Sequence, residues 1–372
     1  MSPTGATLSG SYAGASSTPT ASGFKWGTSS GNLNNTVNNT SASSGTLSAP
    51  LSNLTPGTTY YYKAFVTVSG TGDYESQSET FYGDVQSFTT VAVVLAPGTG
   101  WLELPEVTGS EDFVGKLYGS GSAAGANRNY SYSYDESYYA SLWVAYPLCS
   151  THKSGSASTS TWRYNPYIDN SDQVSIVSNS YGTVYNASAY ARGHQCPNAS
   201  RKSDEQMNLQ TYYATNQTPQ LQNKFNGAIW GSLEGAVRDL ATSQSDTVYV
   251  VTGPAYRKVT DGKETINYLH GASGQNANPS DLPIPNYYWK ALLKVKRNGS
   301  GEVTSAKTIG FWFDHREYES SEHYYDTEHV VSVDQIEEWT GLNLFHNLPG
   351  NETSGIEQSA ESNTSWSSFQ SF

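Results

Sequence analysis

The segment YARGHQCPNAS, residues 190–200, places a histidine directly after an Arg-Gly step. An imidazole changes charge near neutral pH, so His194 could be a general base, a metal ligand or a polar loop residue. Cys196 follows two residues later, and a nearby histidine can activate a cysteine as a nucleophile. We disfavour that role because side chains along an extended strand are offset and no partner for an oxyanion is apparent.

A second polar set follows on a segment with helical periodicity. The helix is expected to begin near Gln222, and its apolar stripe consists of Phe225, Ile229, Leu233, Val237 and Leu240. At about 100° per residue, Asn226, Glu234 and Arg238 share the other half of that helix. Alone, they would be read as a solvated face with a Glu–Arg pair worth a few tenths of a kcal/mol.

Three motifs in order make a stronger pattern. They are Arg192-Gly193-His194, then TNQTPQ at 215–220, then FNGAIWGSLEGAVR at 225–238. Together they resemble the DNA/RNA non-specific endonucleases, the ββα-metal or His-Me finger nucleases. The resemblance covers roughly residues 128–348. It implies an α+β domain that cleaves DNA and RNA at phosphodiester bonds without strong sequence preference, leaving 5′-phosphate ends.

The resemblance also assigns roles to individual residues. His194 would be the general base that deprotonates water. Asn226 would bind Mg²⁺ directly, with Mn²⁺ as an alternative, and Glu234 would hold metal-bound water. Arg238 and Arg192 would bind the phosphate. Asn216 would support the site from behind.

Two positions depart from the family pattern. The family has an aspartate before Arg-Gly-His, where this chain has Ala191, so a carboxylate is missing beside the base. The family often has an arginine two residues before an upstream tryptophan. Here Ser160 takes that place in STWRYNP and Arg163 follows the tryptophan, from where it could supply the charge to substrate.

The cysteines and the remaining histidines leave further questions. Cys149 and Cys196 are the only cysteines, and we expect them to form a disulfide that pins the loop carrying His194. His315, His323 and His329 lie among acidic residues, but their spacing matches no zinc motif, so we read this segment as a solvated acidic loop.

The charge distribution is compatible with a local anion site in an acidic protein. The net charge is −13, but from Asp314 onward there are twelve acidic residues and one basic residue. From Arg192 to Arg238 the sequence contains five basic and three acidic residues. The middle of the chain is therefore mildly basic where the motifs lie, as phosphate binding requires.

The composition and the N-terminal part indicate a second, all-β domain. Only 14% of residues are charged, which suits an extracytoplasmic protein that is secreted, periplasmic or on the cell surface. No apolar run is long enough to span a membrane, and the first ten residues lack the pattern of a signal peptide. In LTPGTTYYYKAFVTV (54–68), Tyr60, Tyr62, Ala64 and Val66 share one face of a strand. The phrase resembles fibronectin type III-like modules.

The predicted organisation has four parts. They are a β-sandwich at 1–92, a linker at 93–127, an α+β nuclease domain at 128–350 and a tail at 351–372. Strands are expected at 141–148, 246–253, 287–297 and 307–315. Helices are expected at 203–213, with Ser203 as its cap, near 222–240, and after Ser332.

Two other functions remain open at the level of sequence. One is a catalytically dead nuclease-like domain that binds glycans through tyrosine and tryptophan surfaces in an adhesion protein. The other is a phosphodiesterase of the same fold with a non-nucleic substrate, which would use the same residues.

Overall fold

The computed structural model describes residues 5–13, 19–41, 45–52, 54, 58–69, 78–90, 100–108, 113–119, 128–243, 246–351 and 354–372. The chain divides into two compact units, Met1–Val94 and Leu95–Phe372, which we describe separately. Within the described ranges, no helix has the length and apolar character needed to cross a membrane.

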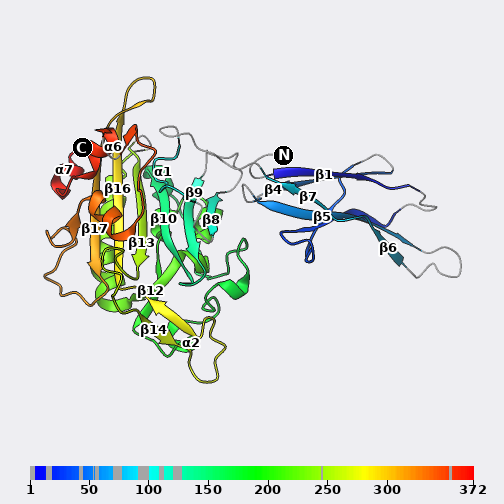
Figure 1. Ribbon diagram of the computed structural model, residues 1–372, viewed down its shortest axis with the longest axis horizontal. Coiled ribbons are helices and arrows are strands. Elements are labelled where there is room, and N and C mark those ends of the chain that lie inside the picture. Colours follow the sequence, from blue (N-terminus) through cyan, green and yellow to red (C-terminus); the bar gives the residue numbers. More distant parts are fainter. Residues whose placement is uncertain are drawn as a thin grey trace. The chain divides into compact units, whose positions relative to one another are not determined.

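In its described residues, the first unit consists of two antiparallel sheets (Figure 1). One sheet pairs β1 (Gly5–Ser11) with β4 (Thr46–Ser52). The other has the order β3-β2-β5-β6, with β7 also paired to β5; its strands are β2 (Ala21–Gly27), β3 (Asn35–Asn38), β5 (Thr59–Ser69), β6 (Ser78–Tyr82) and β7 (Gln86–Thr89).

A shared apolar core joins these two sheets into a sandwich. Leu8 and Leu47 come from the first sheet, and Phe24, Tyr60 and Val66 come from the second. The expected face of the strand after residue 58 is therefore confirmed, because its alternate residues point into this core. The Pro-Gly step at 56–57 lies outside the described residues, and the fibronectin type III-like identity stays a prediction.

The second unit is built on one seven-stranded antiparallel sheet, whose strands run side by side in Figure 1. The order is β18-β17-β16-β13-β10-β9-β8. The strands are β8 (Phe113–Tyr118), β9 (Arg128–Asp135), β10 (Ala140–Leu148), β13 (Val248–Ala255), β16 (Tyr287–Arg297), β17 (Val303–Asp314) and β18 (Val330–Val331).

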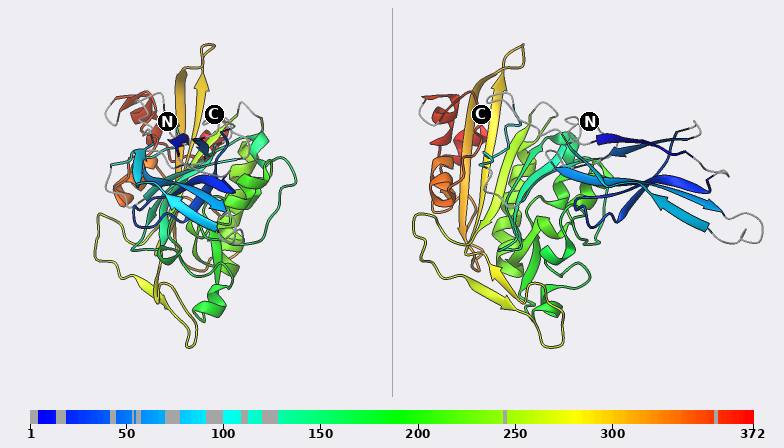
Figure 2. Two further views of the ribbon diagram at one scale, coloured as in Figure 1. Left: turned by 90° about the vertical axis from the view of Figure 1, so that its right-hand side faces the viewer. Right: turned by 45° about the vertical axis from the view of Figure 1, so that its right-hand side comes forward.

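Both faces of this sheet are covered, so its central strands β10 and β13 read as nearly continuous apolar runs. On β10, Val144 and Tyr146 enter one core, while Trp143 and Ala145 enter the other. The first core contains the helical segment Gln222–Leu240, and the second contains the C-terminal helices α5 (Val333–Thr340) and α6 (Ile356–Glu361). The right-hand view of Figure 2 shows these green and orange-red helices on opposite faces.

Short elements complete the unit. Two-stranded ribbons are β11 (Tyr190–His194) with β12 (Gln217–Leu221), β14 (Asn267–His270) with β15 (Asp281–Ile284), and β19 (Gly350–Asn351) with β20 (Ser354–Gly355). The helices are α1 (Ser150–Lys153), α2 (Tyr181–Val184), α3 (Glu205–Gln210), η5 (Gln222–Trp230), α4 (Gly231–Leu240), α5 (Val333–Thr340), α6 (Ile356–Glu361) and α7 (Trp366–Gln370). Single 3-10 turns are η2 (Asn170–Asp172), η3 (Asn198–Ser200) and η4 (Ala214–Asn216).

The structure corrects three expectations about boundaries. The expected linker includes β8, an edge strand of the main sheet, and Leu102, which is buried in its core. The expected tail carries α6 and α7, which pack on the sheet through Ala360 and Phe369. The cap of α3 is Asp204, whose Oδ1 accepts from Met207 N at 2.8 Å, rather than Ser203. Ser203 is one residue too early for its hydroxyl to reach that amide.

Candidate active site

The ribbon β11–β12 carries the predicted general base at the end of its first strand. His194 pairs with Gln217, and Ala191 pairs with Gln220. A Cβ atom at Gly193 would lie only 2.2 Å from Cδ of Gln220, so only glycine fits beneath that side chain. The Arg-Gly-His step is thus fixed by close packing between the two strands.

Aromatic contacts orient the His194 ring. Its centroid lies 4.8 Å from that of Trp162 and 4.9 Å from that of Tyr212, the latter edge to face. Nε2 is buried and has no hydrogen-bond partner, although the residue as a whole is only half-buried. The nitrogen that can reach solvent is therefore Nδ1. Burial, assisted by the positive charge of Arg192, lowers the pKa of His194 to about 4, so the imidazole is neutral near pH 7.

Asn216 holds the backbone that follows the histidine. It is fully buried and accepts a hydrogen bond from Cys196 N at 2.9 Å. Its amide donates to Cys196 O at 3.0 Å and to Thr211 O at 2.8 Å. These contacts support the predicted place behind the site, where the side chain fixes the chain rather than contacting substrate.

The helix with the other polar groups differs from the regular helix that we expected. Residues 222–230 form wide, π-type turns, and the backbone leaves helical geometry at Ala228, with φ −125° and ψ −105°. Because this kink separates Asn226 from Glu234, a single helical wheel does not relate their directions. Glu234 and Arg238 lie beyond it, one turn apart on α4.

Lys290 is a charged residue of the site that the sequence analysis missed. It lies on β16 and is fully buried beneath the helix, with Nζ 3.1 Å from Thr252 Oγ1 and 4.5 Å from the centroid of the Trp230 ring. Burial raises the pKa of Glu234, while Lys290 and then Arg238 oppose that rise. In turn, burial lowers the pKa of Lys290 to about 8. The sequence did contain a signal for Lys290, because it lies within the apolar run YYWKALLKV of an expected buried strand. A lysine is rarely buried unless it has a partner, so a charged partner nearby was to be expected.

The predicted phosphate-binding arginines have different surroundings. The Arg192 guanidinium lies 4.9 Å from the Trp162 ring centroid and donates to the carbonyls of Ile176 and Asn179. Arg163 is held by a backbone bridge to Tyr213, and its buried Nε has no partner. The Trp162 ring therefore contacts both Arg192 and His194. Arg163 directly follows Trp162 in the sequence.

The expected disulfide is absent, because Cys149 and Cys196 are both free and buried. Cys149 caps α1, with Sγ 3.4 Å from Nδ1 of His152. Cys196 lies in the main core, where burial raises its pKa to about 11. A protonated, enclosed thiol is a poor nucleophile, so the structure supports the expectation that Cys196 is not a catalytic nucleophile. The loop is held by Asn216 instead.

The residues present fit a hydrated divalent cation. Asn226 is half-buried, and its side-chain amide has no hydrogen-bond partner among the described residues, so its oxygen is available as a ligand. The segment β11 also packs against η5, which brings the His194 strand to the Asn226 helix. Amide oxygen, carboxylate and water are the ligands that Mg²⁺ accepts.

Comparisons with known proteins find relatives that are named as nucleases. "Nuclease EXOG, mitochondrial" of Danio rerio is 29% identical over 231 residues, 60% of this chain and 61% of the relative. "Nuclease 1, mitochondrial" of Schizosaccharomyces pombe is 29% identical over 168 residues, 44% of this chain and 49% of the relative. "Nuclease" of Serratia marcescens is 31% identical over 211 residues, 56% of this chain and 69% of the relative.

The chain thus spans between about half and three fifths of the first two relatives. The solved structure titled "Crystal structure of the EndoG/EndoGI complex: Mechanism of EndoG inhibition" matches with a TM-score of 0.47 and 21% identity, over 61% of this chain and 85% of that chain. The model of the family described as "DNA/RNA non-specific endonuclease" matches residues 114–351, more than half of the chain. This chain belongs to the DNA/RNA non-specific endonuclease family.

Proposed function

We propose that this protein is a divalent-metal-dependent endonuclease that hydrolyses phosphodiester bonds of DNA and RNA without sequence preference. Mg²⁺ is the proposed metal, and Mn²⁺ is the alternative. The observation that supports the proposal best is the neutral His194 ring, whose Nε2 is enclosed and whose Nδ1 reaches solvent. Such a ring can accept a proton from water at neutral pH but cannot donate one.

The chain's own residues divide the remaining work. Asn226 would ligate the cation through its amide oxygen, and Glu234 would hold water on that cation. Burial raises the pKa of Glu234, and the charges of Lys290 and Arg238 oppose that rise. Arg238 would bind the scissile phosphate, with Arg192 and Arg163 on the Trp162 side. When bound, the metal supplies Lewis-acid stabilisation of negative charge on the phosphate and the leaving 3′ oxygen. Products with 5′-phosphate ends follow from that arrangement.

A plasmid-cleavage assay tests the proposal. Cleavage should require added Mg²⁺ and stop with a chelator, and His194→Ala should slow it at least about 100-fold. His323→Ala, at an exposed histidine outside the site, is the matched control. Asn226→Ala should raise the Mg²⁺ concentration needed for half-maximal rate.

Three results would count against this function. Near-native cleavage by His194→Ala would remove the assigned base. A plasmid that stays intact at high protein and metal concentrations would favour a binding protein, whereas turnover of a small phosphodiester that oligonucleotides do not inhibit would favour a non-nucleic substrate.

The first unit and the location of the protein also remain proposals. We infer that residues 1–92 form a fibronectin type III-like module, whose fold alone assigns it no partner. An extracytoplasmic location is supported by the low content of charged residues, 14%.

A further inference from the structure

The loop between β17 and β18 carries an unusual concentration of negative charge. From Asp314 to His329 there are six carboxylates and one arginine. Part of this charge is neutralised by contacts: Lys224 Nζ lies 3.1 Å from Glu319 Oε1 and 3.8 Å from Glu317 Oε2. The loop as a whole still attracts cations, although acidic loops commonly do so without holding a specific ion.

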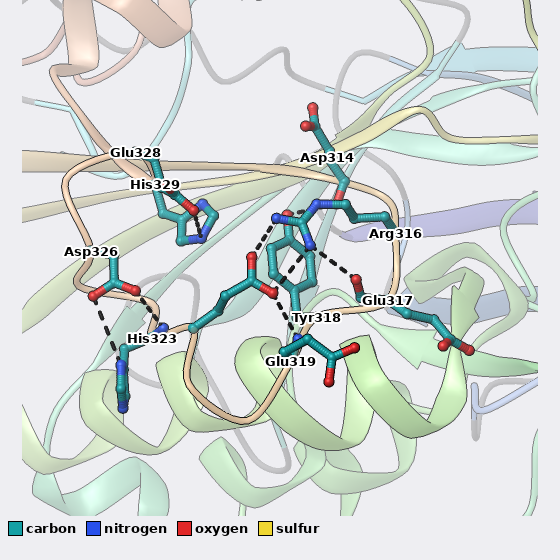
Figure 3. A network of polar contacts seen from close by, with 10 residues as sticks. Asp314, Arg316, Glu317, Tyr318, Glu319, His323, Asp326, Glu328 and His329 are labelled. Carbon is teal, nitrogen blue, oxygen red and sulfur yellow. Dashed lines mark hydrogen bonds and ion pairs between the residues drawn. The ribbon is translucent and has the colours of Figure 1, made fainter.

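His329, at the end of this loop, points to a specific ligand. The residue is only 4% exposed, and its ring stacks on Phe313 at 4.8 Å and meets Tyr318 edge to face at 5.3 Å. Its Nε2 is buried without a hydrogen bond, at a cost that native structures usually avoid. Its nearest carboxylate oxygen, Glu328 Oε1, is 3.4 Å away, at ion-pair distance. Figure 3 marks this contact between His329 and Glu328 with a dashed line.

Three ligand atoms converge at this place. One atom each from Glu322, Glu328 and His329 lie within 4.8 Å of one another. Two ligands of a tetrahedral Zn²⁺ ion, bound at about 2.0–2.1 Å, lie about 3.3 Å apart, close to the separation of the His329 and Glu328 atoms. Small side-chain movements would bring the third ligand to the same spacing.

Glu322 has room for a metal bond despite its other contacts. Its carboxylate accepts from Arg316 at 2.5 and 3.2 Å and from Glu319 N at 2.7 Å. These three hydrogen bonds use three of the roughly four lone-pair sites of a carboxylate. Arg316 therefore orients this carboxylate while leaving one lone pair for a cation.

We propose that Glu322, Glu328 and His329 form a second cation site, separate from the catalytic one, that binds a divalent transition metal such as Zn²⁺. An imidazole nitrogen with two carboxylates suits Zn²⁺ better than Ca²⁺ or Mg²⁺, which prefer oxygen ligands alone. The ion would tie the middle of the loop to its end at β18. The same loop bonds to η5, where Tyr318 N donates to Lys224 O at 3.2 Å, so the ion would also stiffen the support of the helix that carries Asn226.

Zn²⁺ titration of the metal-stripped chain, followed by calorimetry, tests this site. Glu328→Gln should weaken Zn²⁺ binding at least about tenfold. Its side chain is 63% exposed, so the substitution does not threaten folding. Glu319→Gln removes the same charge from the same loop, at a side chain that is 75% exposed, and should leave Zn²⁺ affinity nearly unchanged. Asn226→Ala should also leave this binding in place.

Each contrary result has a clear meaning. Equal Zn²⁺ affinity in Glu328→Gln and the unmodified chain would overturn the proposal. An equal loss in Glu319→Gln would mean that the loop attracts Zn²⁺ only through its net charge. Loss in Asn226→Ala would place the ion at the catalytic site, and tighter binding of Ca²⁺ than of Zn²⁺ would overturn the ligand class.

Discussion

The depressed pKa of His194 should be measurable as a pH dependence of folding stability. Its folded-state pKa of about 4 lies below the ordinary value of 6.5. Below pH 6.5 the unfolded chain therefore binds a proton at this ring that the folded chain refuses. The free energy of unfolding contributed by His194 must fall as the pH drops from 6.5 to about 4, and must not change further below that.

The two pKa values set the magnitude. Between pH 8 and pH 5 the proton taken up by unfolded His194 destabilises the native state by about 2 kcal/mol. Because the ring keeps some exposed surface, this figure is an upper value. Stability is the better observable than activity, since protonation of Glu234, whose pKa is raised by burial, would also reduce turnover in acid.

The assay compares urea unfolding of the unmodified chain and His194→Gln at pH 8 and pH 5, with chelator present. All other titrating groups cancel in the difference, so the variant should gain up to about 2 kcal/mol relative to the unmodified chain at pH 5. His323→Gln reports the effect of removing an exposed histidine. A relative change of zero, or one of opposite sign, would refute the enclosed, neutral imidazole.

Three further substitutions test the supports of the site. Lys290→Met removes a positive charge that lowers the pKa of Glu234, so the pKa of Glu234 should rise further. The acid limb of the rate–pH profile, measured between pH 5 and 8, should then move to higher pH. An unmoved limb would show that Lys290 does not affect the titration of Glu234. Asn216→Ala leaves three backbone groups without their hydrogen-bond partner and should lower the free energy of unfolding, measured by urea titration, by about 3 kcal/mol. A decrease of less than about 1 kcal/mol would contradict the stabilising role of the Asn216 side chain. Gly193→Ala should lower the free energy of unfolding because the added Cβ would collide with the Gln220 side chain. In a double-mutant cycle, Gln220→Ala should restore much of that stability. Strictly additive changes in the free energy of unfolding would argue against the contact.

Local patterns were sufficient to predict some of the strands and helices of the second unit. The strand at 287–297 is observed as β16 with the same bounds, and the helix after Ser332 begins with that residue as its cap. Such signals depend on alternation and on capping within a few residues of one another. The helix that carries Glu234 and Arg238 was predicted for the same reason.

Features that depend on distant contacts could not be predicted. Asn216 reaches Cys196, twenty residues earlier, and Lys290 acts on Glu234 from another strand. The kink at Ala228 is not marked by a proline. The two cysteines suggested a staple by their number alone, but the fold places one in a helix cap and the other in the core.

The positions of these distant contacts explain how an acidic chain can offer a site for a polyanion. The net charge is −13, yet the proposed site includes four basic residues, Arg163, Arg192, Arg238 and Lys290. The negative charge of the acidic loop after β17 opposes the binding of a polyanion, because this loop packs on the helix that carries Asn226. Its contacts with Lys224 and Arg316 already reduce that influence. A cation held by Glu322, Glu328 and His329 would reduce it further, since a local field depends on nearby charges rather than on the sum over the chain.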